Sequence, residues 1–159
     1  MAVQTKKEAC FDLIKTTLDA DTDFKAWHRG GKLYTWDQIT DHPHLMAAAS
    51  CPCVVLAPQS TQRTWANNVD QGHRFTVAIE IYVRRDAKAH IFEGEEIIFN
   101  ALFAHQRDRW SVPYIEDVVF GDSTYDFLIG DEQMASTWHC TLPMTFILRL
   151  DPRDRGDFV

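Results

Sequence analysis

Two long segments of the chain alternate strictly between apolar and polar residues. The first runs from His73 to Arg85 and the second from Thr137 to Leu150. Successive side chains of a strand point to opposite faces, so each segment predicts a long β-strand with one face against a core. Pro143 falls within the second segment, and because proline lacks a backbone N–H, it indicates an edge strand or a bulge there.

Two other segments repeat their apolar residues with the 3.6-residue period of an α-helix. Residues 5–20 predict an amphipathic helix, and residues 89–107 predict a helix that is apolar around more of its circumference. One stripe of the second helix includes Ile91 and Ile98. A neighbouring stripe consists of Phe92, Phe99 and Phe103. One sheet cannot cover both stripes, so we expect a neighbouring subunit to bury part of this helix.

Shorter segments complete the pattern. The run from Cys53 to Ala57 is apolar and closed by Pro58, which favours a short buried strand. Residues 115–120 and 125–129 lie on either side of the turn-forming sequence Gly121-Asp122-Ser123, so we expect a β-hairpin there.

The whole chain predicts one α+β domain spanning residues 1–159. A length of 159 residues with 45% apolar composition suffices for one core and is too short for two ordinary domains. Strands before and after a central helix indicate a mainly antiparallel sheet with two helices packed on one face. Residues 21–52 form an irregular aromatic insert, with room for a short hairpin.

Charge and hydropathy exclude several classes of partner. The formal net charge is -7, which leaves no broad basic face for tight, nonspecific binding of nucleic acid. No apolar stretch approaches 18 residues, and the first twenty positions are too charged for a secretory peptide. We therefore expect a soluble, unsecreted protein without a membrane partner, whose four cysteines are reduced in a cytosol.

One cluster of residues has the composition of a metal site. His42-Pro43-His44 and Cys51-Pro52-Cys53 place four zinc-type ligands within twelve residues. Local zinc-ligand pairs are usually two to four residues apart, whereas each pair here encloses a single proline. The alternative is that the histidines lie in a turn and the cysteines begin a buried strand. We expect no metal and no cofactor.

Catalytic patterns are weak. Cys140 and its neighbour His139 would point to opposite faces of a strand, so only His73 could reach the Cys140 sulfur through folding. The chain also lacks the common phosphate-binding and hydrolase signatures. We therefore expect that the protein is not an enzyme.

Charge is unevenly distributed along the chain. Residues 110–148 contain no Lys or Arg and carry six acidic side chains. Basic residues gather instead at Arg63, Arg74, Arg84, Arg85, Lys88, Arg107 and Arg109. One explanation is a solvated acidic loop. The other is that acidic and basic edges of identical subunits meet in a ring.

The order of elements resembles that of the tail terminator, or tail completion, proteins of long-tailed bacteriophages. The resemblance covers residues 5–20 and 53–150. It includes the strand Val54-Val55-Leu56-Ala57-Pro58, the long strand Phe75 to Val83, the helix from Glu95 through Leu102 and the closing strand Leu142 to Leu150. The insert at 21–52 departs from the short connection that such proteins usually have.

The resemblance implies a structural virion protein that is assembled in the host cytoplasm. Its subunits would form a hexameric ring on the head-proximal end of the tail tube, stop tube polymerisation and contact the head–tail connector. DNA would pass through the ring without specific binding. A related connector protein, and a small cytosolic enzyme or ligand-binding domain, including one with a Cys/His metal site, are the alternatives.

Subunit contacts are expected where charge segregation and the apolar excess coincide. The residues expected at the interface are Arg84, Arg85, Lys88, Ile91, Phe92, Phe99, Phe103, Asp122, Asp126 and Asp131. The long strands 73–85 and 137–150 are expected to have their edges protected by a sheet extended or packed across subunits.

Overall fold

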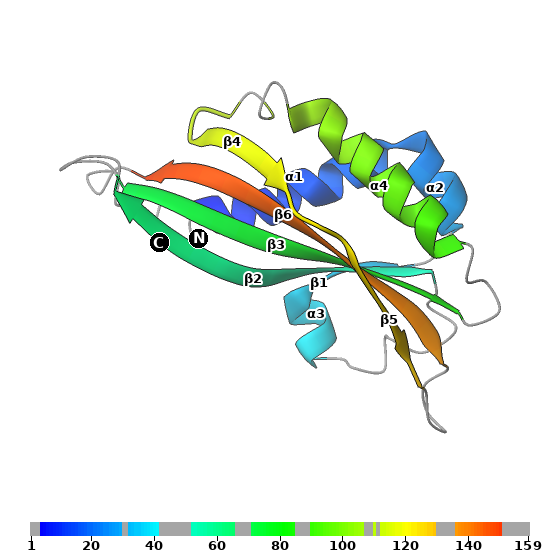
Figure 1. The fold of residues 1–159 in the computed structure, drawn as a ribbon. Helices are drawn as coiled ribbons and strands as arrows, with labels where there is room; N and C mark the ends of the chain where they lie inside the picture. Colours follow the sequence, from blue (N-terminus) through cyan, green and yellow to red (C-terminus); the bar gives the residue numbers. More distant parts are fainter. Residues whose placement is uncertain are drawn as a thin grey trace.

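The computed structural model describes residues 4–29, 32–41, 52–65, 71–84, 90–106, 110, 112–129 and 136–150. The elements follow the chain in the order seen in Figure 1: α1 (Lys6–Ala20), α2 (Thr22–His28), β1 (Lys32–Thr35), α3 (Trp36–Asp41), β2 (Cys53–Trp65), β3 (Gln71–Arg84), α4 (His90–Gln106), β4 (Ile115–Phe120), β5 (Thr124–Leu128) and β6 (Thr137–Leu150).

The strands of the described residues form one six-stranded sheet. Its order is β1-β2-β3-β6-β4, and β5 also pairs with β6. Every strand pair is antiparallel except β1 with β2, which is parallel. The expected α+β fold with a mainly antiparallel sheet is therefore confirmed.

The two long strands predicted by alternation, β3 and β6, are internal strands. They pair with each other along their whole length, from Gln71↔Leu150 to Arg84↔Thr137. On its other side β3 pairs with β2, and β6 pairs with both β4 and β5. The expectation that these two strands have edges to protect is wrong, because their own subunit pairs both sides of each.

The expected hairpin at residues 115–129 is also wrong. β4 and β5 follow one another in the same direction along β6, with a register shift of one residue between Phe120↔Met144 and Thr124↔Thr141. The backbone N–H of Gly121 donates to the Pro143 carbonyl at 2.9 Å, at the junction between the two short strands.

Pro143 explains why the neighbouring strand is interrupted there. In an antiparallel pair the N–H and C=O of one residue point to the same side. The Pro143 carbonyl faces Gly121, so the donor that proline lacks is missing on the β4–β5 side. Pro143 therefore does not mark an edge strand, and the irregularity that it indicates lies in the adjacent strand.

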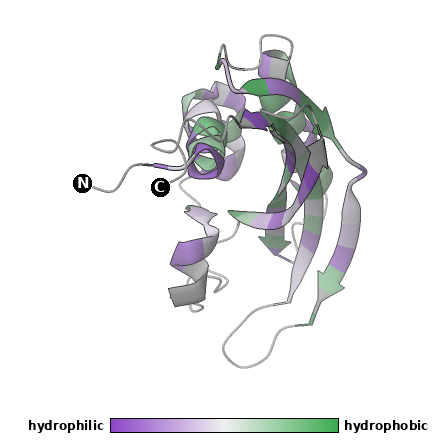
Figure 2. Cartoon of the chain, turned by 90° about the vertical axis from the view of Figure 1, so that its left-hand side faces the viewer, coloured by the Kyte–Doolittle hydropathy of each residue, from purple (hydrophilic) through white to green (hydrophobic). Residues whose placement is uncertain are grey.

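The core lies between the sheet and the helices α1, α2 and α4, which cover one face (Figure 1). Seen from the side in Figure 2, the sheet curves around these helices. The core-facing residues of the long strands, such as Ile79 and Phe146, are buried as the alternation predicted. α1 begins with a capping box between Thr5 and Glu8, which pairs the first free backbone N–H groups of the helix.

The segment 21–52 is more regular than expected, since it contains α2, β1 and α3. α3 lies beside β1 and β2 on the opposite side of the sheet from α1 and α4 (Figure 1). β1 pairs in parallel with the first part of β2, so the segment forms no hairpin within its described residues. β2 is also longer than the run 53–57, because the chain continues past Pro58 through a bulge between Pro58 and Ser60.

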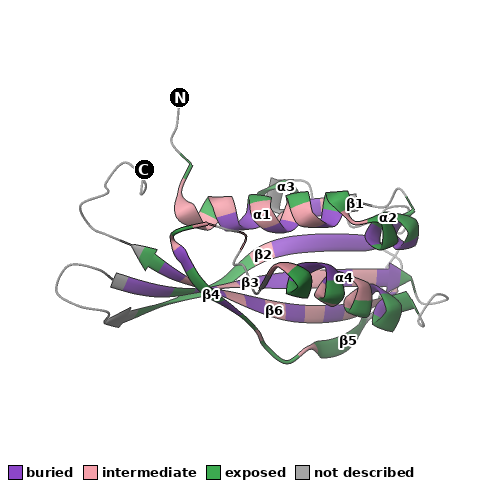
Figure 3. Ribbon diagram, turned by 90° about the horizontal axis from the view of Figure 1, so that it is seen from above, coloured by how far each residue is buried: buried purple, intermediate pink, exposed green. Residues whose placement is uncertain are grey.

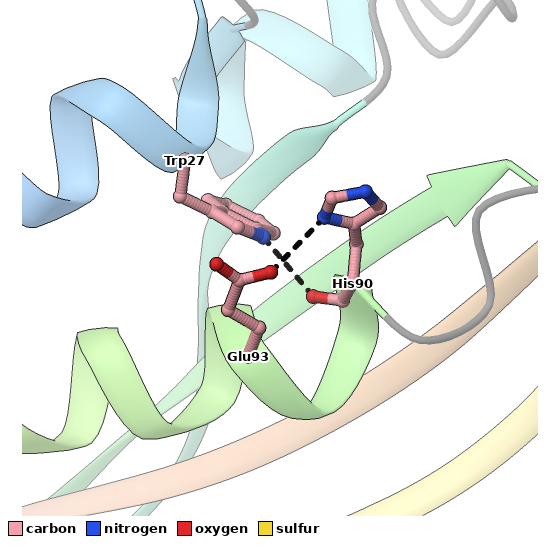
Figure 4. Close-up of polar contacts among 3 residues, drawn as sticks. All are labelled: Trp27, His90 and Glu93. Atoms are coloured by element: carbon pink, nitrogen blue, oxygen red, sulfur yellow. Dashed lines mark hydrogen bonds and ion pairs between the residues drawn. The ribbon is translucent and has the colours of Figure 1, made fainter.

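α2 is anchored to α4 by a tryptophan. Figure 4 shows the Trp27 Nε1–H, which donates to the His90 carbonyl at 3.0 Å, beside the His90–Glu93 pair at the start of α4. The Trp27 ring also packs on Gly94, where an added Cβ would lie 2.6 Å from Trp27 Cε2. The close approach of the two helices therefore depends on the missing side chain at position 94.

Candidate subunit interface

α4 presents two apolar sides, as its composition predicted. One side is buried in the core and includes Ile91, which is only 3% exposed. The expectation that Ile91 lies on a subunit surface does not fit this position, because the subunit itself covers the side chain. The second side faces β4 and β5, where its aromatic residues meet those of the strands.

We call this second surface the aromatic band; it comprises Phe92, Phe99, Phe103, Phe120, Tyr125 and Phe127. Four of its members are large and strongly exposed: Phe92 at 58%, Phe103 at 52%, Tyr125 at 43% and Phe127 at 39%. Ile129, just beyond β5, is 86% exposed. Figure 3 shows these exposed stretches, in green, on α4 and along β5.

The first half of the band lies where α4 begins. Phe92 and Tyr125 meet edge to face with ring centroids 5.3 Å apart. The Tyr125 hydroxyl donates a hydrogen bond to the Glu95 carboxylate, and this bond raises the pKa of the tyrosine. Phe127 packs against Trp138 at 4.8 Å. The aromatic rings are thus held in place, although one side of each faces outward.

The second half of the band lies further along α4. Phe99 stacks on Phe103 at 5.3 Å and meets Phe120 of β4 edge to face at 5.0 Å. Phe99 and Phe120 are half-buried in this cluster, while Phe103 protrudes. The register of β4 along β6 places Phe120 there, opposite Met144. The sequence alone did not bring Phe120 or Tyr125 into this surface, because the expected hairpin would have placed them differently.

The charged residues expected at the interface are only partly within the described chain. Arg84, Asp122 and Asp126 are exposed, whereas Arg85, Lys88 and Asp131 lie outside the described residues. Arg84 and Asp126 belong to the same end of one sheet face, on the two strands that flank β6. The register separates their Cα atoms by two strand spacings and two residues, or about 12 Å.

Asp126 also belongs to a polar cluster on the sheet face opposite the core. Its carboxylate lies 3.9 Å from His139 Nδ1, and the Glu80 carboxylate lies 3.6 Å from His139 Nε2. The His139 ring stacks on Tyr82 at 4.5 Å, and burial raises the pKa of that tyrosine. Only the strand register revealed this cluster, since its residues come from three separate strands.

The candidate Cys/His pairs are kept apart. Cys140 is buried on the helix side of β6, and burial raises the pKa of its thiol to about 12, which makes it a poor nucleophile. His73 stands opposite Leu148, eight positions along β6 from Cys140 and so roughly 27 Å away at the rise of a strand. His139 points to the other face, as expected from its position next to Cys140.

The candidate zinc residues cannot be assembled from the described chain. His42, His44 and Cys51 lie outside the described residues, and Cys53 is buried in a small apolar cluster with Tyr34 and Val55. Within the part of the chain that the structure describes, no three His, Cys, Asp or Glu side chains are placed to hold a metal ion.

A basic corner lies at the other end of the sheet from His139. Arg63 of β2 stands opposite His73 of β3, and Lys7 of α1 lies over the ring of Phe75, two residues further along β3. Burial, Lys7 and Arg63 all lower the pKa of His73. Burial and Arg63 likewise lower the pKa of Lys7. The cationic side chains of Lys7 and Arg63 thus disfavour a positive charge on His73.

Comparisons with known proteins leave the function open. No protein-family model matches the chain, and no curated protein matches its sequence. Among the described helices, none has the length and hydropathy needed to cross a membrane.

Proposed function

We propose that this chain is the subunit of a homo-oligomeric ring, of the kind formed by phage tail terminators. The ring would cap the tail tube at its head-proximal end, stop tube polymerisation and join the tail to the head–tail connector. The observation that carries the proposal is the aromatic band, whose rings are fixed by contacts inside the subunit while large parts of them remain exposed.

The size of the exposed band supports burial by a second copy. Covering the exposed half of one phenylalanine contributes roughly 1 kcal/mol, because full burial of such a side chain contributes about 1.5–3 kcal/mol. Phe92, Phe103, Tyr125 and Phe127 together would therefore contribute several such increments at each interface. A ring repeats the same contact between every pair of neighbours, so a modest interface becomes a stable closed assembly.

The charge of the chain fits passage of DNA through such a ring. The net charge is -7, and residues 110–148 contain no Lys or Arg. Negative charge repels phosphate, so DNA can move past the protein without being retained. The α+β fold and the absence of Lys and Arg over this stretch are both compatible with a structural role, in which the protein acts through its shape and its contacts with other subunits.

Light scattering after gel filtration tests the ring directly. The wild-type protein should elute as a single species with a mass several times 18.3 kDa at micromolar concentration. Phe103→Glu should shift the population towards monomer, because it places a charge in the band. The matched control is Asn100→Glu, an exposed position on the same helix outside the band. A monomeric wild-type protein would contradict the proposal.

The terminator role needs a second measurement. Purified tail tube protein of the same phage should polymerise into tubes of limited length when the ring is added, and electron microscopy should show density capping one tube end. The Phe103→Glu variant should leave tube length unrestricted. Tubes that grow equally with and without the wild-type ring would show that the ring belongs to another part of the virion neck.

A further inference from the structure

The basic corner, formed by Lys7, Arg63 and His73, lies on the face of the sheet that the helices cover. Arg63 of β2 stands directly opposite His73 of β3, and opposite residues of an antiparallel pair project to the same face. Lys7 belongs to the first turn of α1, and its Nζ lies 5.8 Å from the centre of the Phe75 ring. Phe75 follows His73 by two residues and therefore shares its face. Three separate elements thus bring their basic side chains to one place.

His73 brings a buried polar group to this corner. The residue is only 8% exposed, and its Nδ1 is buried without a hydrogen-bond partner within the described residues. Its neighbours across the sheet are apolar, since Leu148 stands opposite it on β6 and Ile115 stands opposite Leu148 on β4. A buried polar atom without a partner costs free energy. The imidazole is therefore a group that a bound ligand can satisfy.

No acidic side chain of the described residues balances the charge of the basic corner. Burial and Arg63 lower the pKa of Lys7, and no described carboxylate is among the groups that shift the pKa of Lys7 or His73. Glu8, the acidic residue of the same helical turn, accepts a hydrogen bond from the Thr5 backbone N–H at 2.7 Å. It caps α1 instead of pairing with the lysine. In a chain with 23 acidic and 16 basic side chains, this lack of a counter-charge is unexpected.

An oxyanion has the chemistry that the corner lacks. The Lys7 ammonium and the Arg63 guanidinium are charged donors, and an imidazole N–H of His73 is a third donor. The start of α1 lies towards the end of the sheet where β2 ends and β3 begins (Figure 1), and the N-terminus of a helix carries partial positive charge. A phosphate group has several strong acceptor oxygens, so it can accept from all three side chains at once.

The charge of the whole chain distinguishes a free phosphate from the phosphates of DNA. The net charge is -7, which repels a long polyanion. A small anion responds mainly to the nearest charges, because salt screens charges that lie more than about 8 Å away at physiological ionic strength. The basic corner therefore fits a small phosphate-type anion better than a DNA duplex.

We propose that the basic corner binds a small phosphate-type oxyanion, held by Lys7, Arg63 and His73 between α1 and the β2–β3 pair. The bound anion supplies the missing counter-charge and joins the start of α1 to the end of the sheet. This site is independent of the ring, because all three residues belong to one subunit.

An NMR titration of the full chain with inorganic phosphate tests the site. Phosphate replaces chloride at constant ionic strength and pH, and the His73→Gln variant identifies the ring signals of that residue. The His73 signals should shift saturably, whereas those of His139, at the other end of the sheet, should stay in place. A His73 signal without a saturable shift, or equal shifts of both histidines, would overturn the proposal.

Charge-removing variants measure the contribution of the two cationic residues. Lys7→Gln and Arg63→Gln should each weaken phosphate binding about tenfold in the same titration, because each removes a hydrogen bond between charged groups. The matched control is Lys25→Gln, which removes the same charge from an exposed position on α2 and should bind phosphate like the wild type. Equal losses in all three variants would indicate general electrostatic attraction and would overturn the site.

Thermal unfolding gives a second readout. A ligand that binds only the folded state raises its stability, so replacing chloride by phosphate at constant ionic strength should raise the melting temperature of the wild type. The rise should be smaller in Lys7→Gln and Arg63→Gln, whatever their stability in chloride, and unchanged in Lys25→Gln. The same rise in all four proteins would mean that phosphate acts only by exclusion from the protein surface, which would overturn the proposal.

A short DNA duplex is the second probe in the NMR titration. At the same concentration of phosphate groups and the same ionic strength, it should leave the His73 signals in place. A shift as large as that with inorganic phosphate would overturn the assignment to a small anion, because the ligand would then be the nucleic-acid backbone.

Discussion

His73 lies at the start of β3 in a corner that it shares with Lys7 and Arg63. Burial and these two cationic groups disfavour a further positive charge on the imidazole, so its pKa in the folded protein is below the ordinary value. The sequence offered His73 only as a candidate catalytic residue. Its position beside Lys7 and Arg63 makes its charge state depend on this corner of the fold.

The position of His73 predicts how stability depends on pH. Because its pKa is lower in the folded than in the unfolded protein, the unfolded state binds more protons as the pH falls below about 6.5. Its stabilising contribution is present above that pH and is lost as the pH falls towards the folded pKa. Urea unfolding of the wild type at pH 7.5 and 5.5 should show lower stability at pH 5.5.

The comparison with His73→Gln isolates this residue from the other histidines. The variant should lose part of the difference in stability between the two pH values, whatever its absolute stability. An unchanged difference would mean that His73 titrates alike in the folded and unfolded states.

At the scale of elements, the contact between α2 and α4 shows how a short helix became part of the core. Trp27 lies over Gly94 and donates to the His90 carbonyl, so α2 packs where a side chain on α4 would block it. α2 belongs to the segment that carried no clear periodicity. Its seven residues are too few to display a helical repeat, and its stability comes from this packing.

Gly94→Ala should destabilise the protein despite placing a better helix former in α4. The gain in helix propensity is about 1 kcal/mol, whereas forcing a methyl group into a packed contact costs about 1–3 kcal/mol. Chemical unfolding should therefore show a small net loss. Asn100→Ala on the exposed side of the same helix is the control and should be neutral or slightly stabilising. A stabilised Gly94→Ala variant would mean that Trp27 moves aside at little cost.

For the whole molecule, the distribution of charge predicts how subunits orient each other. In the pairing expected from the sequence, Arg84, Arg85 and Lys88 meet the acidic residues from Asp122 to Asp131 of a neighbour. Arg84 and Asp126 lie on the same sheet face of one subunit, about 12 Å apart at the spacing and rise of strands, so their effect on assembly must be separated from their effect on folding.

Charge reversal makes that separation. Arg84→Glu with Arg85→Glu should weaken assembly at low salt, and adding Asp126→Lys with Asp131→Lys should restore part of it. Each exposed ion pair contributes only about 0.2–1 kcal/mol, but a ring repeats it at every interface. Sedimentation reports the assembly, and circular dichroism verifies that the subunit stays folded. Normal assembly of the Arg variant would show that these two surfaces do not meet.

The metal content is a further property of the whole molecule. Purified protein should contain no stoichiometric zinc, and a chelator should leave its melting temperature unchanged, because the spacing of His42, His44, Cys51 and Cys53 is unfavourable for joint ligation. Elemental analysis with thermal unfolding is the measurement. One zinc per chain, lost together with stability in chelator, would contradict the prediction and direct attention to these four residues.

The fold class, the long strands β3 and β6 and the long helices α1 and α4 could all be predicted from the sequence. Each of these is long enough for its hydrophobic period to repeat several times, and burial of one face follows from that repeat. The excess of apolar residues on α4 was also evident, because it depends only on which residues occupy the helix.

The pairing of the short strands and the packing of the residues beside them followed only from the three-dimensional structure. Ile115–Phe120 and Thr124–Leu128 have the local pattern of a hairpin, yet both pair with β6. The break between them lies opposite Pro143, which lacks the donor that a continuous neighbouring strand would need. The same choice placed Phe120 and Tyr125 beside α4 and made β4 an edge. Segments far apart in sequence pair in the arrangement that buries the most apolar side chains and satisfies the most backbone hydrogen bonds at once. A local sequence pattern carries no information about the competing arrangements.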